Sequence, residues 1–157
     1  MKRHVTVLLY NIRSTHNVGS MFRTADSAGV TRIYMSGYTP TPLDRFGRSR
    51  KDIAKVALGA ENTIPWEYVS DPKKIIKKLK KDQHQIIGIE QADNSVDYKK
   101  VTVSKQVLFV VGNEVEGIEK EILKLCDVVA EIPMNGKKES LNVSVAFGIA
   151  LFRILGM

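Results

Sequence analysis

Three segments of this chain carry residues whose types and spacing could do chemistry: residues 11–30 (NIRSTHNVGSMFRTADSAGV), 108–118 (LFVVGNEVEGI) and 131–151 (EIPMNGKKESLNVSVAFGIAL). Each joins an apolar, strand-like run to glycine, asparagine, glutamate or serine just before a helix-like run. Such junctions place backbone N–H groups and short polar side chains at the carboxyl edge of a sheet, where open α/β sheets bind ligands. Three junctions in one chain predict a single pocket.

The first segment places Arg23 where core packing does not explain it. Residues 17–29 read as a helix whose apolar stripe lies nearly opposite Arg23. A functional role fits this position, and a surface ion pair with Asp26 is the alternative. Asn17 is expected to cap this helix at its N-terminus, and its amide could also orient Arg23.

The other two segments contribute one carboxylate and two small polar residues. Glu114 lies in an apolar loop close to two glycines, where a functional role competes with that of a simple turn residue. Ser140 is expected to start the last helix as its N-cap. Asn142 then falls inside a helix that is apolar on all sides, where a buried amide needs hydrogen-bond partners.

Apolar runs alternate with amphipathic runs along the whole chain. Strands are expected at residues 5–10, 32–35, 64–69, 86–90, 107–111 and 128–132, and helices at 17–29, 51–58, 72–81, 119–126 and from about residue 140. This alternation is typical of an α/β protein with a mainly parallel sheet flanked by helices. A length of 157 residues fits one domain spanning residues 1–157.

The last helix is apolar almost all round, because apolar residues cover every side of residues 141–155. Such a helix must be buried on two sides, whereas a terminal helix on a small sheet buries only one within its own chain. The other side would most simply meet a second copy of the chain, which predicts a homodimer. An unusually thick core is the alternative. The stretch is too short for a membrane span.

The formal net charge of +7 favours an anionic partner, most often nucleic acid. The loop at residues 42–51 carries four cations against one acid, and arginine suits phosphate geometry. These cations are Arg45, Arg48, Arg50 and Lys51. Residues 72–81 form a second basic region, for which a solvated helix face is the alternative. One cysteine and three scattered histidines predict no metal site, and the N-terminus has no long apolar signal sequence.

Together the three segments resemble the three motifs of the SpoU/TrmH group of SPOUT RNA methyltransferases. The first resembles the group's Asn…Asn-x-Gly/Ser-x-x-x-Arg-Thr pattern through Asn11, Asn17, Gly19, Arg23 and Thr24. The second resembles its Gly-x-Glu-x-x-Gly turn through Gly112, Glu114 and Gly117. The third resembles its Ile-Pro-Met…Ser-Leu-Asn-Val-Ser run through residues 132–134 and 140–144. The similarity extends from residue 4 to the C-terminus.

This resemblance implies an α/β fold whose C-terminal part is threaded into a deep trefoil knot, a feature that is rare among proteins. It also implies an obligate dimer that binds S-adenosylmethionine and methylates a ribose 2′-hydroxyl of tRNA or rRNA in the cytoplasm, with no membrane or metal partner. The cofactor would contact Gly112, Ile132, Met134, Leu141 and, at the end of another strand, Ile89. The catalytic group would be Arg23, Asn17, Glu114, Ser140 and Asn142.

Many members of the group carry additional RNA-binding regions. For this chain we expect the catalytic domain itself to bind RNA, with the lysine-rich residues 72–81 and four arginines as candidates. These arginines are Arg13, Arg45, Arg48 and Arg50.

Family accounts often describe the residue corresponding to Arg23 as a general base, but arginine stays protonated in proteins. A cation that holds the 3′ phosphate and stabilises the developing alkoxide is the easier role. The proton would then leave through the phosphate, Glu114 or water. Two other functions stay open, which are methylation of a base nitrogen such as guanine N1 and RNA binding without catalysis. A Rossmann-type nucleotide domain is disfavoured, because the chain has no Gly-x-Gly-x-x-Gly or P-loop lysine motif.

Overall fold

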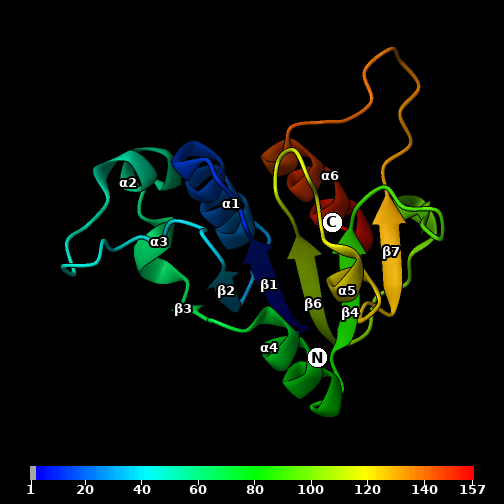
Figure 1. The fold of residues 1–157 in the computed structure, drawn as a ribbon, viewed down its shortest axis with the longest axis horizontal. Coiled ribbons are helices and arrows are strands. Elements are labelled where there is room, and N and C mark those ends of the chain that lie inside the picture. Colours follow the sequence, from blue (N-terminus) through cyan, green and yellow to red (C-terminus); the bar gives the residue numbers. More distant parts are fainter. Residues whose placement is uncertain (1–2) are drawn as a thin grey trace.

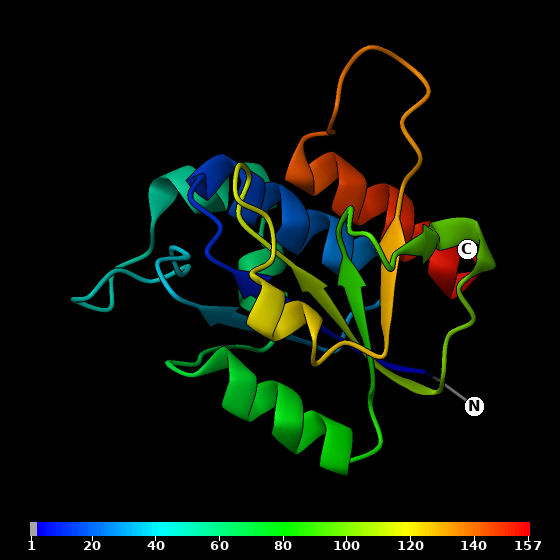
Figure 2. The same ribbon diagram turned by 45° about the vertical axis from the view of Figure 1, so that its right-hand side comes forward.

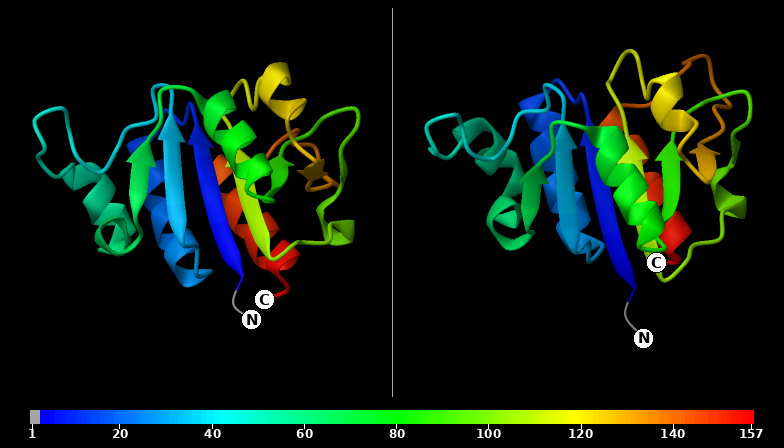
Figure 3. Two further views of the ribbon diagram at one scale, coloured as in Figure 1. Left: turned by 90° about the horizontal axis from the view of Figure 1, so that it is seen from below. Right: turned by 60° about the horizontal axis from the view of Figure 1, so that its bottom comes forward.

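The computed structural model describes residues 3–157, which form one sheet of seven strands. The strands are β1 (His4–Tyr10), β2 (Arg32–Ser36), β3 (Trp66–Tyr68), β4 (Gln85–Ile89), β5 (Val96–Asp97), β6 (Gln106–Val111) and β7 (Val128–Glu131). Their order is β3-β2-β1-β6-β4-β7-β5, and every neighbouring pair is parallel. All strands therefore end at one edge of the sheet (Figure 3). The parallel α/β class expected from the sequence is confirmed.

Helices cover both faces of this sheet. They are α1 (Thr15–Ser27), α2 (Lys51–Ala57), α3 (Ala60–Thr63), α4 (Pro72–Lys81), α5 (Lys120–Leu123), α6 (Val143–Leu155) and the 3-10 helix η1 (Tyr98–Lys100). Helices α1, α2, α3 and α6 lie on one face, and α4 and α5 on the other (Figures 1 and 2). Strand β1 serves both layers, because Val7 and Leu9 pack into the α1 and α6 side, whereas Leu8 packs into the α4 side.

The longer elements begin and end within a few residues of the bounds expected from apolar periodicity. Helix α4 matches residues 72–81 in full, because Pro72 occupies its first turn and the Asp71 carboxylate accepts a hydrogen bond from the Lys74 N–H. The short elements α3, β5 and η1 were not predicted from the sequence, because two to four residues are too few to show a periodicity. The trefoil knot stays a prediction of the resemblance.

Helix α6 has two different sides. Phe147, Ala150 and Leu151 are fully buried, whereas Val145 and Ile149 leave 48% and 39% of their surface exposed. The exposed apolar side is the one that a second copy of the chain would cover, so Val145 and Ile149, rather than Phe147 and Leu151, are the residues that test dimerisation. None of the helices within residues 3–157 has the length and apolar content needed to cross a membrane.

The chain turns sharply where β6 ends. A Cβ atom on Gly112 would lie 2.5 Å from the backbone carbon and oxygen of Gly117, which is closer than real Cβ contacts come. Asn113 and Gly117 exchange two backbone hydrogen bonds of 3.1 and 3.0 Å, and Gly117 has a φ of 70°. Gly112 therefore allows residues 112–118 to fold back on themselves at the carboxyl edge of the sheet.

This close approach makes a testable prediction. Gly112→Ala should lower the free energy of unfolding by about 1–3 kcal/mol, because the added methyl group must push the Gly117 backbone away. Gly136→Ala is the matched control, since a Cβ there meets no atom within 4 Å. Urea unfolding curves measure both variants, and equal midpoints for Gly112→Ala and the parent protein would contradict the close packing of this loop.

Candidate functional site

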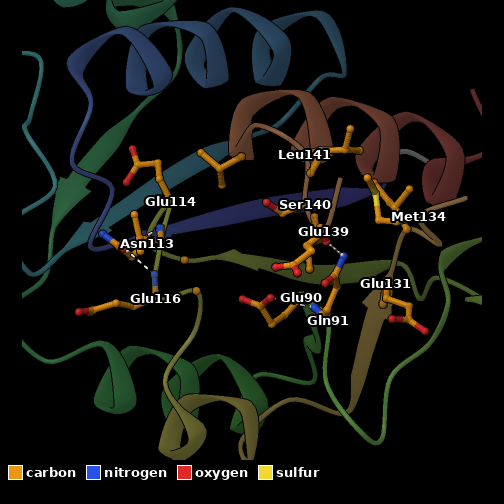
Figure 4. A pocket seen from close by; sticks show the side chains of 18 residues that line it. Glu90, Gln91, Asn113, Glu114, Glu116, Glu131, Met134, Glu139, Ser140 and Leu141 are labelled. Carbon is orange, nitrogen blue, oxygen red and sulfur yellow. Dashed lines mark hydrogen bonds between the residues drawn. The ribbon is translucent and has the colours of Figure 1, made fainter. Parts of the chain in front are cut away.

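A cavity of about 310 Å³ lies at the carboxyl edge of the sheet, where β4, β6 and β7 end (Figure 4). The residues after β4, the 112–118 loop after β6 and the long 132–142 loop between β7 and α6 enclose it. Val143 and Ala146 of α6 complete the lining. The second and third segments singled out in the sequence thus share one cavity.

The cavity is acidic and partly apolar. None of its lining residues is a lysine, arginine or histidine, whereas five are glutamates. The glutamates are Glu90, Glu114, Glu116, Glu131 and Glu139. Ile89, Leu141 and Val143 supply apolar surface. A cavity of this kind suits a ligand that combines a positive charge with a flat apolar group.

The residues expected to contact a cofactor all line this cavity. They are Gly112, Ile132, Met134, Leu141 and Ile89. They come together because β4, β6 and β7 are neighbours in a parallel sheet, so their carboxyl ends open onto the same space. Their contact with a cofactor stays a prediction.

Glu114 connects the 112–118 loop to the chain segment that enters α1. Its carboxylate accepts hydrogen bonds from the N–H of Arg13 at 2.9 Å, the N–H of Ser14 at 3.0 Å and the side-chain amide of Asn17 at 2.9 Å. Hydrogen bonds to a charged acceptor are the stronger kind. Glu114 therefore holds together the first and second of the three segments.

The protonation state of Glu114 follows from these contacts. Burial raises the pKa of its carboxyl group, but the hydrogen bonds from Arg13, Ser14 and Asn17 outweigh burial and hold the pKa below its usual value of 4.5. Glu114 is therefore ionised at neutral pH and poorly suited to take up a proton.

The sequence predicts Asn17 as the N-cap of α1, but this prediction is wrong. The helix starts at Thr15, and the hydroxyl of Ser14 caps it by accepting a hydrogen bond from the Asn17 N–H at 3.2 Å. Serine caps a helix as well as asparagine does, so residue type alone does not favour Asn17 over Ser14. Capping by Ser14 frees the Asn17 side chain, which donates to Glu114 and accepts a 3.2 Å hydrogen bond from the Asn142 amide.

The start of α6 also differs from the expectation. Asn142 is its exposed N-cap rather than a buried residue inside it, and its side-chain oxygen accepts hydrogen bonds from the N–H groups of Ser144 and Val145. Ser140 is therefore not the cap; it is exposed at the end of the 132–142 loop and lines the cavity. Asn142 satisfies its amide through the cap and Asn17, which links the third segment to the other two.

Sequence reasoning missed Asn113 as a residue of the site. Asn113 is buried, and its side-chain oxygen accepts the N–H groups of Val115 and Glu116, both at 2.8 Å. Its amide donates to the Asn11 carbonyl oxygen at 3.0 Å and the Tyr38 hydroxyl at 2.8 Å. Asn113 thereby fixes the 112–118 loop to the end of β1. An asparagine directly after a strand-ending glycine was the available signal.

Glu90 and Gln91 lie directly after β4, at the strand end (residues 86–91) that the resemblance implies as a further cofactor loop, and both line the cavity. The Glu90 carboxylate accepts the N–H of Ile118 at 2.9 Å, and the Gln91 amide donates to the backbone oxygen of Glu139 at 2.9 Å (Figure 4). These two bonds connect the end of β4 with the 112–118 loop and the 132–142 loop. An acid and an amide that follow a buried strand were the signal in the sequence.

Arg23 does not line the cavity of its own chain. It is exposed on α1, as its place opposite the apolar stripe indicates. Its neighbour Thr24 faces α6, because a Cβ on Gly148 would lie 3.5 Å from the Thr24 methyl group. Arg23 thus lies on the exposed side of α1, and its catalytic role stays a prediction.

The candidate RNA-binding arginines are distributed over two places. Arg13 is exposed beside Glu114, and Arg45 and Arg48 are exposed in the loop between β2 and α2. Arg50 at the start of α2 is half-buried. Within residues 3–157, no group of three or more histidine, cysteine, aspartate or glutamate side chains is arranged to hold a metal ion.

Replacing the Glu114 carboxylate tests its structural role. Glu114→Gln should lower the free energy of unfolding by about 1.5–3 kcal/mol at neutral pH, because an uncharged amide accepts the three N–H donors less well. A lowered pKa stabilises the fold above the usual value of 4.5, and this contribution is lost as the pH falls through the folded-state pKa. The difference between parent and variant should therefore shrink in acid.

The matched control is Glu116→Gln, which changes an exposed carboxylate in the same loop. Urea unfolding at neutral and acidic pH measures the parent protein and both variants. A Glu114→Gln penalty that is the same at both pH values, or equal to that of the control, would contradict this description.

Known proteins match this chain over most of its length. The sequence profile of the SpoU rRNA Methylase family matches residues 4–152. The tRNA (guanosine(18)-2′-O)-methyltransferase of Aquifex aeolicus is 30% identical over 96% of this chain and 68% of its own length. The 23S rRNA (guanosine-2′-O-)-methyltransferase RlmB of Nitrosomonas europaea is 34% identical over 93% of this chain and 54% of its own length. The chain spans little more than half the length of several of the curated relatives that it matches.

Solved structures have the same fold. An AdoMet-bound rRNA methyltransferase from Sinorhizobium meliloti superposes with a TM-score of 0.86 at 28% identity, over 98% of this chain and 56% of that one. The TrmH/SpoU tRNA modifying enzyme of A. aeolicus gives a TM-score of 0.85 at 29% identity, over 98% of this chain and 74% of that one. With a family profile that matches almost its whole length, this chain belongs to the SpoU rRNA methylase family.

Proposed function

We propose that this protein is an S-adenosylmethionine-dependent RNA methyltransferase that acts on a ribose 2′-hydroxyl of tRNA or rRNA in the cytoplasm. The observation that carries the proposal is the acidic cavity at the carboxyl edge, whose loops are joined through Glu114, Asn17 and Asn142. Relatives named as guanosine 2′-O-methyltransferases of tRNA and rRNA support it.

The cavity fits S-adenosylmethionine by charge and by shape. When bound, this cofactor supplies an electrophilic methyl group on a sulfonium centre. The glutamates of the lining favour its net positive charge, and Ile132 and Leu141 offer apolar surface to an adenine ring. Backbone groups near Gly112 and Met134 are available to the edges of that ring.

The residues of the chain divide the remaining work. Arginine is a permanent cation in proteins, so we assign Arg23 the task of holding an RNA phosphate and stabilising the charge that develops on the 2′-oxygen. Glu114 positions the loops and does not accept the proton, because three N–H donors occupy its carboxylate and lower its pKa. The proton leaves through the phosphate or water. We assign contact with the sugar to Ser140, because it is exposed and lines the cavity.

A homodimer would bring Arg23 to a cavity. Arg23 is exposed on α1, which packs against α6. The exposed apolar residues Val145 and Ile149 lie on the same helix as the cavity residues Val143 and Ala146. A partner that covers Val145 and Ile149 therefore reaches the rim of the cavity. We infer that the partner subunit supplies its own copy of Arg23 to this cavity, in a symmetric dimer.

The direct test is to incubate the purified protein with labelled S-adenosylmethionine and total RNA, and to identify the product nucleoside by mass spectrometry. The proposal expects a methyl group on ribose. A methyl group on a base nitrogen would favour the guanine N1 alternative. Binding of RNA without cofactor binding or methyl transfer would favour a non-catalytic role.

Arg23→Ala should separate chemistry from cofactor binding. Turnover should fall by roughly 100-fold or more, because charge on the 2′-oxygen loses its cation, while S-adenosylmethionine affinity stays within a few-fold. Single-turnover methylation and titration calorimetry measure the two effects. Lys55→Ala, which removes an exposed charge from α2, is the matched control, and unchanged turnover in Arg23→Ala would remove Arg23 from the mechanism.

Ile149→Asp should convert the dimer into a folded monomer. The charge would be buried at the proposed interface, whereas in the single chain Ile149 is 39% exposed and tolerates it. The monomer should still bind S-adenosylmethionine, since one chain lines the cavity, and should lose methyl transfer. Sedimentation velocity and calorimetry check this, with Leu58→Asp at the exposed residue directly after α2 as the control. An active monomer would contradict the shared site.

A further inference from the structure

The loop between β2 and α2 forms a small hairpin at residues 42–50, which we call the 42–50 hairpin. Leu43 and Ser49 pair as an antiparallel bridge, the Asp44 N–H donates to the Arg48 oxygen at 2.8 Å, and the Arg50 N–H donates to the Pro42 oxygen at 2.9 Å. Gly47 at its tip has a φ of 76°, which a side chain rarely allows. The hairpin is therefore a built structure within a long connection.

Asp44 fixes the tip of this hairpin. Its carboxylate accepts the N–H groups of Phe46 at 2.8 Å and Arg48 at 3.0 Å, and it pairs with the Arg48 side-chain Nε at 3.0 Å. The hydrogen bond from the Arg48 N–H is the main cause that lowers the pKa of this carboxyl group, so Asp44 is ionised at neutral pH. Three contacts from one carboxylate orient the residues on either side of Gly47.

The oriented side chains are an exposed aromatic ring and two cations. Phe46 leaves 66% of its surface exposed, although an isolated aromatic residue gains nothing by facing water. The Arg45 guanidinium carbon lies 4.7 Å and the Arg48 guanidinium carbon 4.9 Å from the centre of the Phe46 ring. A nucleobase can stack on this exposed ring by displacing a guanidinium group from it, and the displaced cation is then free to meet the adjacent phosphates.

We propose that the 42–50 hairpin binds an unpaired nucleotide of the RNA substrate, with the base stacked on Phe46 and the adjacent phosphates held by Arg45 and Arg48. This inference rests on the proposed RNA substrate and narrows it to RNA with an accessible single-stranded position. An RNA partner is favoured over a protein because two arginines flank the ring and Lys51 and Arg50 follow at once.

The hairpin acts at a distance from the methylated nucleotide of its own subunit. Figures 1 and 2 both place residues 42–50 at the end of the molecule opposite the 132–142 loop that borders the cavity. The contact therefore selects and orients RNA rather than taking part in methyl transfer. Changes in the hairpin should affect RNA affinity and leave S-adenosylmethionine affinity unchanged.

The test measures binding of a fluorescent RNA stem capped by a single-stranded loop, with the same stem closed as a full duplex for comparison. Phe46→Ala should weaken binding of the looped RNA by roughly fivefold or more, as loss of one base–aromatic stack does, and should leave duplex binding unchanged. Phe46→Trp should bind at least as well as the parent protein. Phe46→Leu should behave like Phe46→Ala, because it keeps apolar surface without a ring.

Salt dependence separates stacking from charge. Arg45→Ala should reduce the slope of log affinity against log salt by about 1, whereas Phe46→Ala should leave the slope unchanged. Asp44→Ala should weaken binding although it makes the protein more positive, because the ring and cations lose their orientation. Tighter binding by Asp44→Ala would mean that net charge alone attracts RNA, and would overturn the proposal.

Calorimetry with S-adenosylmethionine confirms that each variant is folded. Full looped-RNA affinity in Phe46→Ala or Phe46→Leu would refute the stack, and a changed oligomeric state would assign Phe46 to a protein contact instead. Failure of the hairpin proposal can be distinguished from failure of the proposed methyltransferase activity. RNA binding that depends on Phe46 without methyl transfer would reject the enzyme and keep the hairpin, and ribose methylation that is insensitive to Phe46 would do the reverse.

Discussion

A chain of hydrogen bonds from Glu114 through Asn17 to Asn142 is the interaction on which the site depends. Asn17 lies 97 positions from Glu114 and 125 from Asn142 in the sequence, yet bonds of 2.9 and 3.2 Å connect the three segments into one unit. Glu114, at one end of this series of hydrogen bonds, is ionised and holds the segment that enters α1. Asn142, at the other end, caps α6. The second and third of these segments line the cavity, so the hydrogen bonds that hold them in place contribute to its shape.

Charge is divided across the molecule in a way that suits two different ligands. The cavity is lined by glutamates, whereas the net charge of +7 resides elsewhere, including the 42–50 hairpin and the lysines of α4. A positively charged cofactor and a polyanionic RNA would each meet a surface of opposite sign. Arg23 is exposed on α1, away from the acidic cavity of its own subunit. In the proposed dimer, it would supply a cation to the cavity of the partner subunit, where cofactor and RNA meet.

The sequence could predict the fold class and most of the residues that line the cavity. Buried parallel strands read as apolar runs, and β4, β6 and β7 each end in a recognisable change from apolar to polar residues. Cap positions could not be predicted, because Ser14 and Asn17, or Ser140 and Asn142, are equally good caps by type. Only the tertiary contacts decide which residue caps each helix. They engage the Asn17 side chain with Glu114 and Asn142, whereas Asn142 itself caps α6. Single-turn elements such as α3 and the two-residue β5 carry too little pattern to be found.

A double-mutant cycle on Asn17 and Asn142 tests the central claim most directly, with S-adenosylmethionine affinity measured by calorimetry as the readout. If the two amides act through one hydrogen bond that holds the 132–142 loop in place, either Asn17→Ala or Asn142→Ala breaks it. The double variant should then lose less affinity than the sum of the two single losses, because the bond between the two amides can be lost only once. Losses that add in full would show that the two residues act independently, and would contradict the account.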